Sequence, residues 1–427
     1  MPTAQRQRSV ALYSPGWPPG RVSNGIVTYV GHLRPALERL GIRTSVVAPT
    51  PIGPSSVPTI DLGRRRQPRI RDLFLRALRK VPGYTSEGLR LGWAVGQAAA
   101  DLAARSGLDL LEMEESFGAA WYAQQLLDIP VVARLHGPRF LNGAVLGLPI
   151  DDEFRRIDQA ERRCIAEATG VTAPSRDVLD RARRHYDLPL VDALVIPYPG
   201  PMVPPDRRWR LEGCDRRSIL FVGRFDRHKG GDVMIDAFRE VAAKVPNAEL
   251  LFVGVDRGLR DDAGRTHNLP DYLDAHLPAE IRSRVQVFGE LDWERIEALR
   301  RQAYLTVVPS RYETFGFTVA ESLAFGCPTV AADAGAIPEV LLGDQTGLLF
   351  RAGEPADLVS KIVTLFAHPE RAAQFGREGA VDVNRRLDPD LIARTTLDYY
   401  QVLWSRRLRA PAHHRSWRVA YRLTGLL

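Results

Sequence analysis

Two cations in a glycine-bearing segment are the residues of this chain with the clearest capacity for chemistry. Arg224 and Lys229 lie within Val-Gly-Arg-Phe-Asp-Arg-His-Lys-Gly-Gly, residues 222–231, between a predicted strand and a predicted helix. A departing diphosphate gains negative charge as its bond breaks, and fixed cations stabilise that charge. Arginine grips two oxygens in a planar fork, whereas lysine acts as a point charge. The segment therefore indicates a diphosphate site, and two solvated surface cations are the alternative.

Two glutamates with seven residues between them form a second cluster. Glu313 lies in the turn of Pro-Ser-Arg-Tyr-Glu-Thr-Phe-Gly-Phe-Thr-Val-Ala-Glu, residues 309–321, and Glu321 lies in the helix that follows. A carboxylate suits a sugar because it accepts hydrogen bonds from two neighbouring hydroxyls. The amides of residues 314–317 lie near a helix N-terminus, where an anion is favoured. Glu321 stands in an apolar stretch, where a carboxylate needs a partner; an exposed helix face is the alternative.

Both clusters need a scaffold that places strand ends together, and the alternation of short apolar runs with helical patterns predicts one. The first half starts with a strand–loop–helix–strand order, which indicates a βαβ unit and a parallel sheet. The expected strands of this half are 10–13, 44–48, 108–112, 131–135, 170–173 and 194–196, and the expected helices include 26–40, 92–105 and 154–168. The predicted fold class is therefore α/β, with a doubly wound sheet.

A proline-rich stretch divides the chain. Residues 197–216 are too rich in proline for a helix or a central strand, so we interpret them as a linker between a domain 1–196 and a domain 217–395. The second half is expected to have strands 218–222, 249–253, 285–288, 305–308 and 329–332 and helices 232–244, 292–301 and 318–325. A helix of about 391–407 is expected to close this second domain, and residues 396–427 are assigned to the terminal helix and a basic tail. Because ligands bind at the carboxyl ends of parallel strands, the architecture predicts a site in a cleft between two Rossmann-like domains.

The motifs of the second half resemble glycosyltransferase family 4, whose members are retaining enzymes of the GT-B fold. Five motifs occur in the family's order: Gly-Arg-x4-Lys-Gly from Gly223, Pro-Ser-x2-Glu-x7-Glu from Pro309, Gly-Cys-Pro-Thr-Val from Gly326, Gly-Ala-Ile-Pro-Glu-Val from Gly335, and Gly-Leu-Leu from Gly347. The resemblance is dense over residues 218–350 and looser over the first domain.

The resemblance implies a role for each residue of the second domain's clusters. Arg224 and Lys229 would clamp the donor diphosphate, Glu313 would bind hydroxyls of the donor sugar, and Glu321 would bind those of the ribose. Further donor contacts would come from Gly223, from the amides of Phe315, Gly316 and Phe317, and, beside the nucleobase, from the strand end 285–290. The family usually works without a metal, so no metal ligand and no cofactor other than the nucleotide sugar substrate is expected.

Two positions in the first domain also match the family. Gly25 follows Asn24 in a loop after the first strand, where the family usually has two glycines, and its helix N-terminus would meet phosphate or acceptor. The substitution is mild because asparagine also tolerates left-handed backbone geometry. His136, after the strand 131–135, matches the family's active-site histidine near the reacting carbon. Residues 197–200, Pro-Tyr-Pro-Gly, depart from the family's proline-asparagine-glycine-valine, so no site residue is carried over there.

Composition and charge limit the setting in which the protein works. No apolar run approaches the ~20 residues of a membrane span, and the apolar run 10–13 is too short for a signal peptide, so we expect a cytoplasmic protein. The three cysteines favour neither a disulfide framework nor a zinc site. Residues 1–110 carry fifteen arginines and one lysine against six acidic residues. Within the basic stretch 64–80, a helix from Arg69 would be amphipathic and cationic, which suits an anionic membrane or acceptor; a solvated loop and helix is the alternative. No motif supports nucleic acid.

The sequence thus predicts a retaining glycosyltransferase that moves a sugar from a nucleotide diphosphate to the hydroxyl of an acceptor, by front-face displacement. The acceptor is a glycan, a glycolipid or a small molecule. Two alternatives stay open at this point. One is a sugar-nucleotide epimerase or a phosphorylase of the same architecture, and the other is a non-catalytic protein that binds sugar nucleotides.

Overall fold

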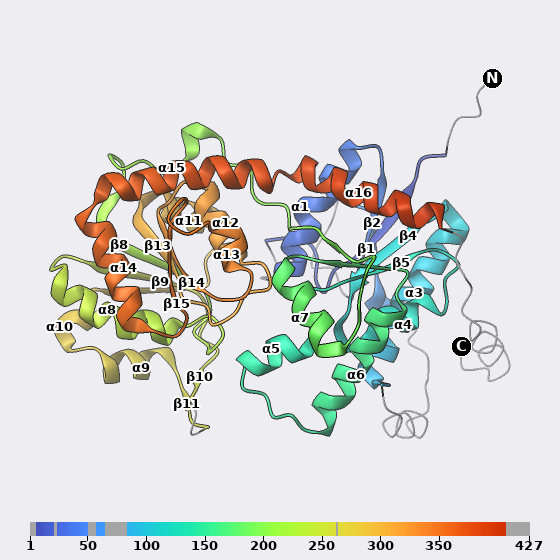
Figure 1. The fold of residues 1–427 in the computed structure, drawn as a ribbon, viewed down its shortest axis with the longest axis horizontal. Coiled ribbons are helices and arrows are strands. Elements are labelled where there is room, and N and C mark those ends of the chain that lie inside the picture. The colour runs from blue at the N-terminus through green and yellow to red at the C-terminus, as the bar shows by residue number, and fades with distance from the viewer. Residues whose placement is uncertain (1–5, 21–23, 50–56, 65–82, 262–263, 407–427) are drawn as a thin grey trace. The chain divides into compact units, whose positions relative to one another are not determined.

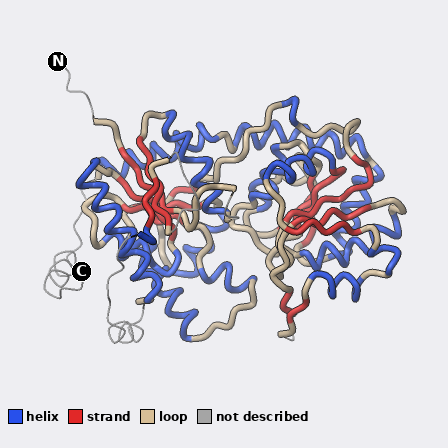
Figure 2. The backbone as a smooth tube through the Cα atoms, turned by 180° about the vertical axis from the view of Figure 1, so that it is seen from behind, coloured by secondary structure: helices blue, strands red, loops and turns tan. Residues whose placement is uncertain are grey.

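The computed structural model describes residues 6–20, 24–49, 57–64, 83–261 and 264–406 of the 427-residue chain. The chain forms two compact units. The first consists of residues 1–199 together with 389–427, and the second of residues 200–388. Figure 1 labels their elements, and Figure 2 shows the strands of each unit lying together between helices.

The first unit is built on a seven-stranded parallel sheet with the order β3-β2-β1-β4-β5-β6-β7. Its central strands are buried on both faces, as expected for a parallel sheet that helices cover; all five residues of β1 are buried. The strands are β1 (Ser9–Tyr13), β2 (Arg43–Ala48), β3 (Thr59–Asp61), β4 (Leu110–Glu114), β5 (Val131–Arg134), β6 (Gly170–Ala173) and β7 (Leu194–Val195).

The helices of the first unit pack apolar faces onto this sheet. In α1 the buried positions Val27, Val30, Leu33 and Leu37 recur at intervals of three and four, the period of one helix face. The helices are α1 (Gly25–Arg39), α3 (Ser86–Ser106), α4 (Ala119–Gln124), α5 (Arg139–Val145), α6 (Asp152–Glu167), α7 (Arg176–Tyr186) and α16 (Pro389–Ser405).

The second unit has a six-stranded parallel sheet with the order β12-β9-β8-β13-β14-β15 and a short antiparallel pair, β10 and β11. Its strands are β8 (Asp215–Val222), β9 (Glu249–Val253), β10 (Leu259–Arg260), β11 (Thr266–His267), β12 (Val285–Gly289), β13 (Ala303–Val308), β14 (Thr329–Asp333) and β15 (Leu348–Arg351). Its helices are α8 (Gly231–Lys244), α9 (Leu269–His276), α10 (Ala279–Arg282), α11 (Trp293–Gln302), α12 (Phe317–Ala324), α13 (Ile337–Val340), α14 (Pro355–Ala367) and α15 (Pro369–Arg386). Two parallel α/β units confirm the predicted fold class.

The segment interpreted as a linker differs from the expectation. From Gly200 onward it belongs to the second unit, and β8 already begins at Asp215. Trp209 is buried, its backbone N–H donates to Phe325 O, and its indole N–H donates to Ala303 O, both at 2.7 Å. A proline-rich composition excludes helix and central strand, but it does not prevent an irregular segment from packing onto a domain.

The terminal helix is also placed differently from the expectation, because α16 belongs to the first unit and does not close the second. It packs against α1, and Figure 1 shows it in red beside that helix. The Tyr400 hydroxyl donates to Glu112 Oε2 at 2.8 Å, and the Tyr399 hydroxyl donates to Val171 O at 3.1 Å. These buried tyrosines attach the helix to β4 and β6.

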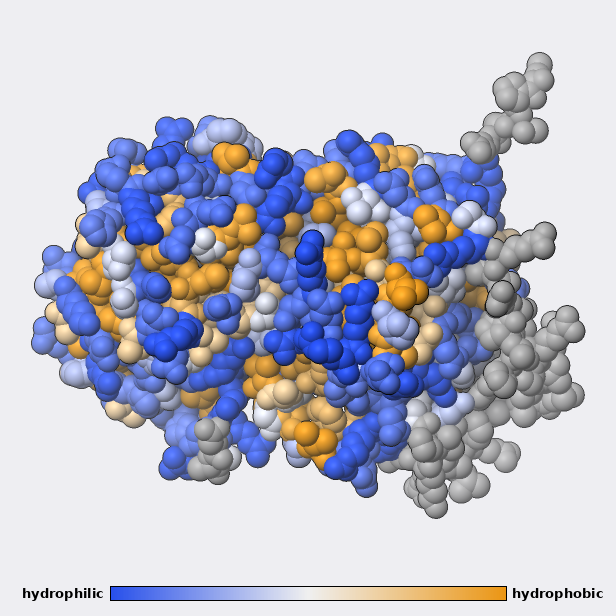
Figure 3. Space-filling model, viewed as in Figure 1, coloured by the Kyte–Doolittle hydropathy of each residue, from blue (hydrophilic) through white to orange (hydrophobic). Residues whose placement is uncertain are grey.

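Among the described residues, no helix combines the length and the apolar character that a bilayer span requires. The face drawn in Figure 3 is mostly hydrophilic, with smaller hydrophobic areas between the polar ones. Most of the basic stretch 64–80 and most of the tail after Trp404 lie outside the described residues, so the membrane contact remains a prediction.

Candidate functional site

Two loops of the second unit lie side by side because they follow neighbouring strands. β8 and β13 pair in parallel, so the loop 223–230 and the loop 309–316 leave the same edge of the sheet. Arg311 N donates to His228 O at 2.9 Å. Gly230 has a φ of +67°, and a Cβ there would lie 2.0 Å from Pro309 O. Only glycine permits this approach, which brings the two predicted clusters together.

An ion pair joins the two clusters. Lys229 Nζ lies 2.6 Å from Glu313 Oε1, and the Ser310 hydroxyl donates to the same oxygen at 2.8 Å. Burial by itself would raise the pKa of Glu313. The charges of Lys229 and His228 and the hydrogen bonds from Lys229 and Ser310 outweigh it, so this pKa lies below its ordinary value. Glu313 is therefore ionised and held in place.

A buried aspartate that the sequence reasoning did not single out orients both cations. Arg224 Nε donates to Asp226 Oδ2 at 2.7 Å, and the backbone N–H of Lys229 donates to Asp226 Oδ1 at 2.8 Å. The Arg224 side chain is 43% exposed, whereas that of Asp226 is 10% exposed. Asp226 thus holds the Nε–H of the Arg224 guanidinium, and the other N–H groups of Arg224 remain accessible to a ligand.

The predicted need of Glu321 for a partner is met by Arg300 of α11. Arg300 Nη2 lies 2.6 Å from Glu321 Oε2, and the arginine side chain is 0% exposed. Arg300 Nη1 also donates to Thr318 O at 3.3 Å, in the first turn of α12. Burial raises the pKa of Glu321, and the charge and hydrogen bond of Arg300 offset only part of this effect. The glutamate is therefore partly buried, with 16% of its side chain exposed, and it is paired with Arg300, which excludes the exposed helix-face alternative.

Phe315, Gly316 and Phe317 form the turn into α12. Gly316 is the residue before the helix and has a φ of +94°, a conformation that favours glycine. The rings of Phe315 and Phe317 contact each other edge to face, with 5.2 Å between their ring centroids. Gly223, in the neighbouring loop, is packed so that a Cβ would lie 3.0 Å from the ring of Phe221 and 3.3 Å from Lys229 Cβ.

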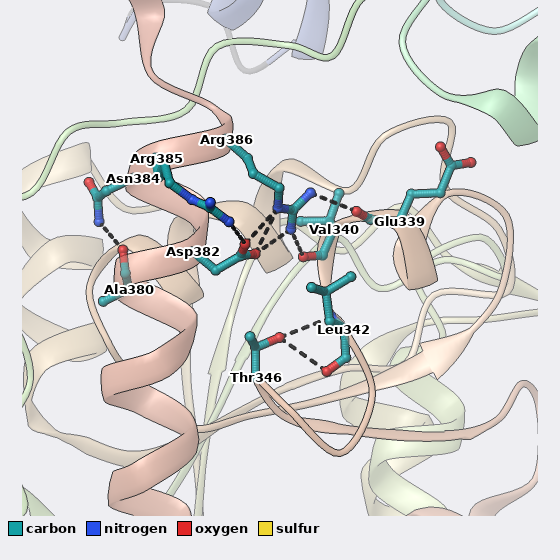
Figure 4. A network of polar contacts seen from close by, with 9 residues as sticks. All are labelled: Glu339, Val340, Leu342, Thr346, Ala380, Asp382, Asn384, Arg385 and Arg386. Atoms are coloured by element: carbon teal, nitrogen blue, oxygen red, sulfur yellow. Dashed lines mark hydrogen bonds and ion pairs between the residues drawn. The ribbon is translucent and has the colours of Figure 1, made fainter.

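A third segment, residues 335–340, contains the short helix α13, contacts Glu313 and receives hydrogen bonds from α15. Ala336 N donates to Glu313 O at 2.8 Å, and a Cβ on Gly335 would lie 2.3 Å from that same oxygen. Figure 4 shows Arg386, oriented by Asp382, donating to Glu339 O at 2.9 Å and to Val340 O at 2.8 Å. Arg386 thereby satisfies carbonyl groups at the end of α13 and fixes the segment that supports Glu313.

In the first unit, Gly25 is the first residue of α1, one residue before the predicted start of that helix, and Asn24 also differs from the expectation. Asn24 has an extended backbone, with a φ of −154°, and its side chain accepts a hydrogen bond from Ile26 N at 2.8 Å. It is therefore a helix N-cap and not a left-handed substitute for glycine. The Asn24 carboxamide accepts from the backbone N–H of Ile26, so this donor at the N-terminus of α1 is already used and cannot bind an anion.

His136 follows β5 in a partly buried position. Its backbone N–H donates to Glu115 Oε2 at 2.9 Å, and Gly137 N donates to Glu115 Oε1 at 2.8 Å. Nδ1 of the ring is hydrogen-bonded with the hydroxyl of Tyr198. Burial and the charge of Arg134 lower the pKa of His136 well below its ordinary value, so the imidazole is neutral.

Glu115 gives the first unit a pH dependence that can be measured. Burial raises its pKa to about 7, against the hydrogen bonds from His136 and Gly137. The folded state then binds a proton that the unfolded state releases near pH 4.5. The free energy of unfolding therefore falls as the pH rises from about 4.5 to 7, by up to about 3 kcal/mol from this group.

Glu115→Gln is expected to reduce the slope of the free energy of unfolding against pH. The measurement is denaturant unfolding between pH 4.5 and 7.5, and the comparison uses the slope and not the stability of the variant at any one pH. The exposed Glu153 of α6 offers a control, and Glu153→Gln is expected to keep the slope of the parent chain. An unchanged slope in Glu115→Gln would show that another group titrates.

The predicted residues thus fall into two groups. Arg224, Lys229 and Glu313 are joined by direct contacts or through Asp226, and Lys229 also acts on the pKa of Glu321 through its charge. Gly25 and His136 lie in the first unit. Among the described residues, no three His, Cys, Asp or Glu side chains are grouped so that they could hold a metal ion.

Each of the two units contains a match to a glycosyltransferase family model. Residues 23–199 match the model described as Glycosyltransferase Family 4, and residues 206–381 match the model described as Glycosyl transferases group 1. The chain belongs to glycosyltransferase family 4. A D-inositol 3-phosphate glycosyltransferase of Xylanimonas cellulosilytica is 28% identical over 90% of this chain and 93% of its own length. An alpha-D-kanosaminyltransferase of Streptomyces kanamyceticus is 27% identical over 58% of this chain and 66% of its own.

Solved structures show the same fold for this glycosyltransferase. Sucrose-phosphate synthase of Thermosynechococcus elongatus aligns with a TM-score of 0.69 and 22% identity, over 93% of this chain and 99% of that one. Anabaena HepE, solved in complex with UDP-glucose, aligns with a TM-score of 0.65 and 17% identity, over 92% of this chain and 99% of that one. Both confirm the GT-B fold. The family favours neither an epimerase or phosphorylase nor a non-catalytic binding protein.

Proposed function

We propose that this glycosyltransferase moves a sugar, with retention of configuration, from a nucleotide diphosphate sugar to the hydroxyl of an acceptor. The observation that carries the proposal is the contact between Lys229 and Glu313, beside Arg224, at the carboxyl ends of two adjacent parallel strands. A diphosphate at the cations and a sugar at the carboxylate would then be neighbours, as they are in a nucleotide sugar. The structure of HepE with UDP-glucose supports this class of donor.

The two carboxylates have the hydrogen-bonding capacity that the proposal requires. Lys229 and Ser310 both bind Oε1 of Glu313, and Arg300 binds Oε2 of Glu321. Within the described part of the chain, this leaves one oxygen of each carboxylate to accept hydroxyls of the donor. We assign the sugar to Glu313 and the ribose to Glu321. Phe315, Gly316, Phe317 and Gly223 would line the donor's path between them.

The mechanism that fits these groups is front-face displacement. Arg224 and Lys229 supply the positive charge that stabilises the leaving diphosphate, a task that needs no metal if both cations are held. Glu313 is a weak base because its pKa is lowered. The proton of the attacking hydroxyl is therefore assigned to an oxygen of the departing diphosphate, and no side chain is assigned as the general base.

The test is transfer by the purified chain in the presence of EDTA. A panel of nucleotide sugars that includes UDP-glucose is incubated with candidate acceptors, and release of the nucleoside diphosphate is followed. D-inositol 3-phosphate is the first acceptor to test, because a relative of nearly the same length is named for it. The anomeric configuration of the product, read by NMR, is expected to match that of the donor.

Four outcomes would contradict the proposal. An inverted product would exclude retention, and dependence on a divalent cation would exclude the metal-free mechanism. Binding of a donor without turnover on any acceptor, or epimerisation of the donor without an acceptor, would exclude transfer.

A further inference from the structure

A buried arginine organises a cluster of aromatic side chains beneath His136. Arg134, the last residue of β5, is fully buried, and it donates to Ile196 O at 2.6 Å and to Thr172 Oγ1 at 3.2 Å. Its guanidinium lies 4.4 Å from the ring centroid of Tyr29 and 5.0 Å from that of Tyr198. Cation–π contacts of this kind hold aromatic rings in a fixed orientation.

Tyr198 is the member of this cluster that contacts His136. Its hydroxyl is hydrogen-bonded with Nδ1 of the imidazole, and the two ring centroids lie 5.5 Å apart. Tyr198 is itself buried, and it also lies 4.9 Å from the ring of Tyr29. Packing on both sides therefore leaves the hydroxyl little freedom to turn away from the imidazole.

The chemistry of the two groups decides which of them donates. Burial raises the pKa of Tyr198, so the phenol keeps its hydrogen, and His136 is neutral, with one nitrogen protonated and one carrying a lone pair. An imidazole lone pair is a much stronger acceptor than a phenol oxygen, because imidazole is the far stronger base. The positive charge of Arg134 opposes the effect of burial on the pKa of Tyr198, and a more acidic phenol is a stronger hydrogen-bond donor.

We propose that Tyr198 is a positioning residue, which donates its hydroxyl hydrogen to Nδ1 of His136 and thereby keeps the imidazole proton on Nε2. His136 then presents an N–H group from Nε2 and acts as a neutral hydrogen-bond donor, not as a base. That this N–H contributes to sugar transfer rests on the proposed function; the tautomer itself does not. Tyr198 lies in the Pro-Tyr-Pro-Gly segment, where the family pattern gave no residue to carry over.

The tautomer can be measured in the intact protein. The full chain is labelled with 15N-histidine, and long-range 15N–1H correlations are recorded near pH 7.5. The signals of His136 are those missing from a His136→Gln variant. We expect a protonated Nε2 and an unprotonated Nδ1. A proton on Nδ1, or a doubly protonated ring, in the parent chain would overturn the proposal without recourse to any variant.

Tyr198→Phe separates positioning from packing, since it removes the hydroxyl and keeps the ring. The Nε2–H preference is expected to be lost, and kcat is expected to fall about fivefold, the effect of one hydrogen bond, with KM for the donor within about twofold. Tyr400→Phe is the matched control, because Tyr400 is equally buried and donates its hydroxyl to Glu112 instead. It is expected to leave the tautomer and kcat unchanged. An unchanged tautomer in Tyr198→Phe would also overturn the proposal.

The two proposals fail in different ways. Absence of transfer by a parent chain with the expected tautomer would refute the proposed function alone. Transfer by a parent chain with a proton on Nδ1 would refute the role of Tyr198 alone.

Discussion

Lys229→Ala is expected to lower turnover by about 100- to 1000-fold. This is the usual effect of removing one preorganised group that stabilises developing negative charge, about 3–4 kcal/mol. The side chain of Lys229 is held at Glu313 Oε1 by the ion pair of 2.6 Å before any donor arrives, so no reorganisation is needed. The measurement is initial rates of nucleoside diphosphate release at saturating donor.

The loss must be distinguished from unfolding, because the substitution leaves Glu313 buried without its main partner. Glu313 keeps the hydrogen bond from Ser310 and can take up a proton, which limits the loss of stability. Thermal unfolding is therefore measured beside turnover. Lys244→Ala is the control, since Lys244 is an exposed lysine in the last turn of α8. Turnover of Lys229→Ala equal to that of Lys244→Ala would remove the diphosphate role.

Arg300→Met is expected to cause the largest loss of stability, about 3–5 kcal/mol in the free energy of unfolding at pH 7.5. Breaking a buried ion pair from one side leaves a buried charge without compensation. Methionine fills much of the volume, so the loss reports the charge on Glu321 more than a cavity. The measurement is denaturant unfolding of the parent chain and the variant, followed by tryptophan fluorescence.

The pH and a second substitution test this explanation. At pH 5 the loss is expected to shrink, because Glu321, whose pKa is already raised, takes up a proton. Glu321→Gln combined with Arg300→Met is expected to recover part of the stability for the same reason. A loss of the same size at both pH values, and in the double variant, would attribute it to packing.

Hydrophobic periodicity predicted the sheets well because each buried parallel strand is a short apolar run with a polar boundary. The expected strands 170–173 and 249–253 coincide with β6 and β9. The expected helix 26–40 is shifted by one residue from α1, and the expected helix 232–244 starts one residue after α8 does. The expected strand 108–112 is displaced by two residues from β4, Leu110–Glu114, because apolar Leu108 precedes the strand and Met113 and acidic Glu114 belong to it. The helices α14 and α15 were not predicted individually.

The site residues that lie in loops directly after neighbouring strands could be predicted from the sequence. The partners that contact them from distant parts of the chain could not. The positions of Lys229 and Glu313 follow from the parallel order of β8 and β13. Arg300 lies in a helix of mixed polarity, Trp-Glu-Arg-Ile-Glu-Ala-Leu-Arg-Arg-Gln, in which one arginine looks like the next. Only packing shows that Arg300 is buried against Glu321. Tyr198 was hidden for the same reason, because its contact with His136 spans 62 residues.

The return of the chain to the first unit at Pro389 has a consequence for its synthesis. Glu112 accepts a hydrogen bond from the hydroxyl of Tyr400, which lies 288 residues later in the chain. This buried contact therefore forms only after the whole second unit has been translated. At about 5–20 residues per second, the ribosome needs roughly 15–60 s to cover that interval. During this time the nascent first unit lacks its last helix, and the face of α1 that α16 will cover is open to chaperones.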